Sequence, residues 1–147
     1  MNLRDAAALA NRLIDAYPQF ELREQTLEIY TKWLHDLDRR ATETAVDELI
    51  ATSVVLPTVA EVRRTVLEQT TDLPTAVEAW LSLAERGHEI HELTREVGQL
   101  FGDTWGIRTS EEPGITRTQF LKAYEAARER RLRELNTSQF RRRRRAA

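Results

Sequence analysis

The chain has 147 residues, of which 41% are hydrophobic and 31% charged, enough for one or two small domains with a packed core. It has no cysteine, which excludes disulfides and thiolate metal sites, and no apolar run long enough to span a membrane. The net charge of −2 hides an asymmetry, because residues 1–116 carry 11 Lys and Arg against 21 Asp and Glu (11 − 21 = −10) and residues 117–147 carry 11 against 3 (11 − 3 = +8). We expect a cytoplasmic protein with an acidic body and a basic end.

Apolar residues at three- and four-residue spacing predict helices from the start of the chain. The first stripe, from Leu3 to Leu13, stops at Pro18 and predicts a helix over about residues 3–16. Stripes from Leu27 to Leu37 and from Ala41 to Ile50 predict two more helices, which the short turn "DLDRR" makes antiparallel neighbours. The expected core residues of this part are Trp33, Leu34, Leu49 and Val62.

Two nearly identical stretches, "LPTVAE" at residues 56–61 and "LPTAVE" at residues 73–78, mark further helix starts. In each, a threonine is followed three residues later by a glutamate, the pattern of a reciprocal capping box. The sequences that follow the two copies have little in common, so the repeated six residues are a helix-start signal and not a domain repeat. "TRTQF" predicts a third box, through Thr116 and Gln119.

The remaining elements are also predicted to be helical, apart from one loop. A helix over about residues 90–100 is expected to end at Gly102 in a left-handed cap, and "DTWGIRTSEEPGI" to follow as a loop. The last helix becomes mostly charged after Ala127 and is expected to fray. The expected inward residues are Val77, Trp80, Leu81 and Ala84 in the helix after Thr75, and Phe120, Tyr124, Ala127 and Arg131 in the last helix.

These elements predict an all-α fold in three parts. Residues 3–69 form a bundle of about four helices, residues 75–135 a smaller C-terminal helical unit, and residues 136–147 a basic, flexible and disordered tail. The boundary is placed in "TTDLP", residues 70–74, because no apolar period crosses it.

No residue pattern indicates catalysis. His88 and His91 lie three residues apart, whereas the zinc metalloprotease motif has its histidines four apart, and further zinc ligands are missing nearby. The sequence has no glycine-rich phosphate loop, and its carboxylates alternate with arginines as solvated ion pairs do. We therefore predict no catalytic residue, no metal, no cofactor and no enzymatic activity.

Candidate binding residues are concentrated in the C-terminal part. A run of like charges is typical of a disordered arm that binds nucleic acid weakly and without sequence preference, and the alternative is a tail that only solubilises. Trp105 is a candidate for partner binding because it lies in the expected loop between Gly102 and Gly106, and Arg128 and Arg131 are candidates on the last helix. The nucleic-acid candidates are Arg141, Arg142, Arg143, Arg144 and Arg145.

Residues 13–66 carry an "AYPQF" helix end, a tryptophan in the next helix, "AVDELIATS" in the third and "PTVAEVR" at the start of the fourth. This stretch resembles the N-terminal domain of the bacteriophage replicative helicase loader and inhibitor family. The part from "PTAVEAW" through "QFLKAYEAARERR" looks like the tail region of related phage and actinobacterial proteins. The resemblance implies a non-catalytic adaptor that binds the hexameric replicative helicase, holds it inactive and delivers it to an origin-bound replisome organiser.

Two other functions stay open at this point. The last helix and its arginines could make the chain a small helical DNA-binding regulator. A structural or assembly protein, with the acidic body as its interaction surface, is the third class. Loss of function on removing residues 137–147 would favour the DNA-binding regulator, since an adaptor needs its body more than its tail.

Overall fold

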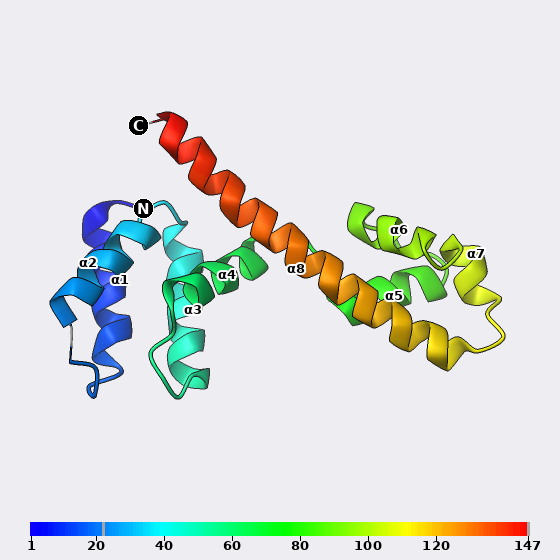
Figure 1. The fold of residues 1–147 in the computed structure, drawn as a ribbon, viewed down its shortest axis with the longest axis horizontal. Coiled ribbons are helices and arrows are strands. Elements are labelled where there is room, and N and C mark those ends of the chain that lie inside the picture. The colour runs from blue at the N-terminus through cyan, green and yellow to red at the C-terminus, as the bar shows by residue number, and fades with distance from the viewer. Residues whose placement is uncertain (22, 147) are drawn as a thin grey trace. The chain divides into compact units, whose positions relative to one another are not determined.

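A computed structural model describes residues 1–21 and 23–146 of the chain (Figure 1). The described residues form eight helices and no strand, and 74% of the chain is helical, which confirms the all-α prediction. The helices are α1 (Leu3–Asp15), α2 (Arg23–Leu34), α3 (Arg39–Thr52), α4 (Val59–Thr70), α5 (Ala76–Ala84), α6 (Glu92–Gln99), α7 (Asp103–Arg108) and α8 (Pro113–Ala146).

The helices are grouped in two compact units. The first comprises Met1–Thr71 together with the chain from Asn136 onward, and the second comprises Asp72–Leu135. The long helix α8 contributes to both units, because the division falls within it. Each unit has its own buried residues and is described by itself.

In the first unit α1 packs against α2 and α3, and α3 packs against α4. The side chain of Asn2 caps α1 by accepting a hydrogen bond from the Asp5 backbone N–H at 2.7 Å, and the helix ends ahead of Pro18 as predicted. Leu34 and Val62 are fully buried, and Leu49 packs half-buried against them. The core comprises Ala10, Leu13, Tyr17, Tyr30, Leu34, Leu37, Ala45, Val46, Val62 and Val66.

Trp33 is not in this core, and the prediction that it would be is wrong, because 38% of the residue is exposed. Successive helix residues are about 100° apart, so the face of α2 centred on Tyr30 and Leu34 leaves Trp33 to one side. The helical spacing through Trp33 and the spacing through Leu34 are equally regular in the sequence. Only the packing of α2 against its neighbours selects between them.

Both predicted capping boxes are present. At α4 the Thr58 backbone N–H donates to Glu61 Oε2 at 2.6 Å, and the Glu61 N–H donates to Thr58 Oγ1 at 3.2 Å. Thr75 and Glu78 form the same pair of hydrogen bonds at α5. The third box is wrong: α8 begins at Pro113, so Thr116 and Gln119 lie inside it. Proline is favoured at the first position of a helix, so the helix begins at Pro113, three residues before Thr116.

The second unit has an aromatic core. The Phe120 ring lies 5.5 Å from Trp80, 5.8 Å from Phe101 and 5.9 Å from Tyr124 between ring centroids, all within the range of favourable aromatic pairs. The Tyr124 hydroxyl donates to the Pro74 carbonyl at 2.8 Å. Trp80, Phe120, Tyr124 and Ala127 are buried, as predicted.

The predicted inward face of α5 is only partly right. Val77 and Leu81 are exposed, and the buried side is formed by Ala79, Trp80 and Leu83. A nine-residue helix that is apolar on most sides carries too little contrast to define one face from sequence. Contact of α5 with α6 and α7 decides the orientation, and Leu83 packs directly over Gly98.

The segment predicted as a loop from residue 103 is partly helical, as α7. Gly102 is left-handed, with φ of 78°, as predicted, and Asp103 follows with φ of 59°. A Cβ atom at position 106 would collide with the Phe101 carbonyl oxygen, so the tight turn requires glycine there. Arg108 then donates to the Leu83 carbonyl at 3.0 Å and ties α7 to the end of α5. This packing stabilises a helix too short to be recognised by periodicity.

The end of the chain also differs from the prediction of a disordered tail over residues 136–147. The structure continues α8 as helix through Ala146, and residue 147 lies outside the described residues. Leu132, four residues before this segment, is buried. Arginine is a good helix former, and positive charge is favourable in the last turn of a helix because of the helix dipole.

Candidate protein-interaction surface

Arg63 is a charged residue enclosed in the first unit, with 1% of its surface exposed. Its Nη1 and Nη2 donate to the two carboxylate oxygens of Asp36 at 2.7 and 3.0 Å, a bidentate pair. Nη1 also donates to the Trp33 carbonyl, and Nε donates to Asn136 Oδ1 at 2.9 Å. Arg63 therefore joins α4 to the end of α2 and to the last part of α8. The sequence showed this arginine in "PTVAEVR" without showing its partners.

The loop between α3 and α4, residues 53–58, is held at both ends by buried tyrosines, and we call it the valine loop. Tyr17 donates from its hydroxyl to the Ser53 carbonyl at 3.0 Å and lies 3.3 Å from the Leu49 carbonyl. Tyr30 donates to the Pro57 carbonyl at the other end. Burial raises the pKa of Tyr30 above its ordinary 10.0, and the Glu61 carboxylate raises it further, so the hydroxyl remains a donor at neutral pH.

The tip of the valine loop presents two apolar side chains to solvent. Val54 is 90% exposed and Val55 is 70% exposed. They lie in an uncharged stretch, residues 49–60, of a chain in which almost a third of all residues are charged. A fixed loop with exposed apolar side chains loses little conformational entropy when a partner covers it. The valine loop is therefore a candidate protein-binding surface.

A second exposed apolar pair lies on α2. Ile29 and Trp33 are one helical turn apart, and both are exposed. The ammonium of Lys32 lies 5.7 Å from the centre of the Trp33 ring, within cation–π range. Tryptophan is enriched among the residues that dominate binding energy at protein interfaces. Sequence periodicity placed Trp33 in the core and so did not predict its exposure.

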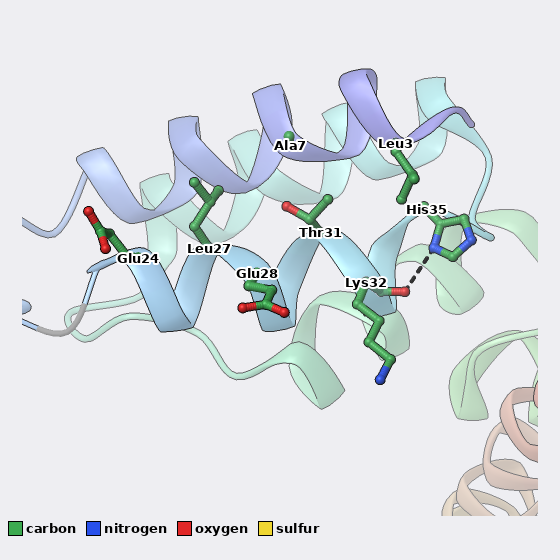
Figure 2. Close-up of a pocket in the computed structure, with 8 residues that line it drawn as sticks. All are labelled: Leu3, Ala7, Glu24, Leu27, Glu28, Thr31, Lys32 and His35. Carbon is green, nitrogen blue, oxygen red and sulfur yellow. Dashed lines mark hydrogen bonds between the residues drawn. The ribbon is translucent and has the colours of Figure 1, made fainter.

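A groove between α1 and α2 adds a third feature (Figure 2). It has a volume of about 400 Å³ and a largely apolar lining. Figure 2 shows Leu3 and Ala7 from α1 facing Leu27 and Thr31 from α2 across the groove. The other lining residues are Glu24, Glu28, Lys32 and His35.

The residues proposed from sequence for partner binding lie elsewhere. Trp105 is on α7 and 76% exposed, so it is available for contact. Arg128 and Arg131 are on α8 and half-buried, and Arg131 Nη2 lies 4.0 Å from Glu92 Oε2 in the second unit. Trp105 thus comes from a different helix than the two arginines, and Arg131 is engaged within its own unit.

His88 and His91, the two histidines three residues apart, make contacts with residues close to them in sequence. His91 Nδ1 accepts from the Leu93 backbone N–H at 3.1 Å and caps α6, and His88 lies 3.1 Å from Glu85. Within residues 1–21 and 23–146 no group of three or more His, Asp or Glu side chains is arranged to hold a metal ion. Across the same residues, every helix is too short or too polar to cross a lipid bilayer.

Comparison with known families bears on the unit that carries the valine loop. Residues 1–63 match the family model of the N-terminal domain of a phage helicase loader and inhibitor. The match confirms the resemblance seen over residues 13–66, and it includes the valine loop, Trp33 and Arg63. The family consists of phage helicase-interacting proteins that act as non-enzymatic adaptors. Comparisons with curated proteins and with solved structures gave no match.

Proposed function

We propose that this chain is a non-catalytic DNA-replication adaptor that binds a hexameric replicative helicase and loads or inhibits it. The observation that carries the proposal is the match of residues 1–63 to the N-terminal domain of the helicase loader and inhibitor family. The buried contacts of Arg63 and the exposed valine loop lie within or at the edge of this matched part. An origin-binding replisome organiser is the expected second partner.

We further propose that the valine loop is the helicase contact of the N-terminal unit. Val54 and Val55 supply apolar area for the contact. Binding costs little conformational entropy there, because the two ends of the loop are already hydrogen-bonded to Tyr17 and Tyr30. Trp33 and Ile29 on α2 supply a second apolar contact on the same unit. Because the loop and its neighbours in sequence carry no charge, we expect the contact to be insensitive to salt.

The proposed adaptor does not use nucleotide itself. Its sequence has no glycine-rich phosphate loop, so any effect of ATP on the complex is expected to come from the helicase.

Co-purification with the replicative helicase of its host, in the presence and absence of ATP, tests this function. We expect a stable complex in at least one nucleotide state, and a changed ATPase or unwinding rate of the helicase in that complex. The isolated chain is expected not to bind ATP. Failure to form a complex in either state, or stoichiometric ATP binding by the chain alone, contradicts the proposal.

A further inference from the structure

The last turns of α8 carry a concentrated positive charge. The chain from residue 136 onward has five arginines and no acidic residue, a net of +5. Arg141, Arg142 and Arg145 are exposed, whereas the side chains of Arg143 and Arg144 lie outside the described part of the structure. Residues 1–71 of the same unit carry 8 Lys and Arg against 12 Asp and Glu (8 − 12 = −4). The unit thus joins an acidic body, residues 1–71, to one strongly basic segment.

The run of five arginines lies on α8, where successive residues are about 100° apart, so its positions surround the helix axis. Arg141, Arg142 and Arg145 are the members whose side chains the structure describes. Arg141 and Arg145 are one turn apart, about 6 Å along the helix axis, and Arg142 is about 100° around from Arg141. We call this set the arginine face. Its guanidinium groups each carry several N–H donors and can engage separate phosphate groups.

The arginine face follows directly from a fixed point. Asn136 accepts from buried Arg63 at 2.9 Å, and Arg141 comes five residues later, about 7.5 Å along the helix. The segment therefore starts from a contact with the unit that carries the family match. A charged surface held in this way can keep a partner next to that unit.

We propose that the arginine face binds the phosphate backbone of nucleic acid without reading its sequence. Charge complementarity selects this partner, because clustered arginines release counterions from phosphates. A membrane surface is less suitable, since an interfacial helix needs an apolar face and residues 136–146 contain one large apolar residue, Phe140. Sequence readout requires donors and acceptors placed against base edges, which a uniform set of arginines does not supply. This activity goes beyond helicase binding and would keep the adaptor on DNA.

Fluorescence anisotropy with a labelled duplex, and with one of its strands alone, tests this at a series of salt concentrations. The full-length protein is compared with R141Q/R142Q/R145Q. The matched control R4Q/R40Q/R86Q removes the same charge from three other exposed arginines. A third variant, R141K/R142K/R145K, retains the charge, and circular dichroism of each protein verifies its fold.

We expect salt-dependent binding that is equal for unrelated sequences. Each phosphate contact on duplex DNA contributes about −0.9 to the slope of log K against log salt, so losing three contacts should flatten the slope by about 2.7. The control and the lysine variant should keep the slope of the wild type. An unchanged slope in the glutamine variant, or equal flattening in the control, overturns the proposal. So does stronger binding to anionic phospholipid vesicles than to either nucleic acid, because the partner is then a membrane.

Discussion

Arg63 shows how one residue can connect three elements of the first unit. Its guanidinium lies almost without solvent contact between Asp36, the Trp33 carbonyl and Asn136. A buried charge is tolerated only with well-formed partners, because its desolvation is costly. From sequence, Arg63 and its exposed neighbour Arg64 are indistinguishable, so its place in a polar network could not be predicted.

We expect Arg63→Ala to lower the free energy of unfolding by about 3–5 kcal/mol, the cost of breaking a buried ion pair by removing one partner. Arg64→Ala is the control, since Arg64 pairs at the surface with Glu68 and should change stability by less than about 0.5 kcal/mol. Urea denaturation followed by circular dichroism measures both. Equal effects of the two substitutions would show that Arg63 is not held as described.

Leu34 and Trp33 are neighbours in sequence with different surroundings, and their substitutions should differ accordingly. Leu34→Ala removes a fully buried side chain and is expected to cost about 3 kcal/mol. Trp33→Ala should cost clearly less, despite the larger side chain, because Trp33 is partly exposed. Thermal or urea denaturation compares the two variants. A larger loss of stability for Trp33→Ala than for Leu34→Ala would show that Trp33 belongs to the core.

At the scale of elements, the sequence predicted a structure well where residues within one helical turn determine it. The capping boxes at Thr58 and Thr75 need only residues within one turn, and both were predicted. The third box failed because Pro113 offers an earlier helix start. The helix α7 depends on a left-handed turn at Gly102 and on packing against α5, neither of which leaves a periodic pattern in six residues.

The capping box of α4 makes a pH-dependent prediction. Hydrogen bonds from the Thr58 backbone N–H and then from its hydroxyl hold the pKa of Glu61 below its ordinary 4.5. The charged carboxylate therefore favours the folded state above pH 4.5, and this contribution disappears as the pH falls through the lowered pKa. Thr58→Ala should cost about 1 kcal/mol at neutral pH and less in acid. Urea denaturation at both pH values measures the difference, and a cost that stays constant would contradict the assignment.

At the scale of the whole molecule, the fold class and the resemblance of the N-terminal part to a helicase-related family could be predicted from the sequence, whereas the candidate surface could not. In the sequence, Val54 and Val55 are indistinguishable from core residues. Their exposure arises because Tyr17 and Tyr30 fix the ends of the loop from other helices. The arginine run was predicted as a binding segment, but its helical conformation and the contact between Asn136 and Arg63 required the three-dimensional structure.

We propose above all that the first unit contacts a replicative helicase through the valine loop. Sedimentation velocity of the host's hexameric helicase with the full-length protein tests it most directly, alongside the variants V54S/V55S and V77S/L81S. The second variant removes exposed apolar side chains from α5 and serves as the matched control. We predict that the wild type and the control sediment with the hexamer and that V54S/V55S does not, with its melting temperature unchanged. Separate sedimentation of the wild-type protein and the helicase, with and without ATP, would contradict the adaptor function, and co-sedimentation of V54S/V55S would contradict the assigned surface.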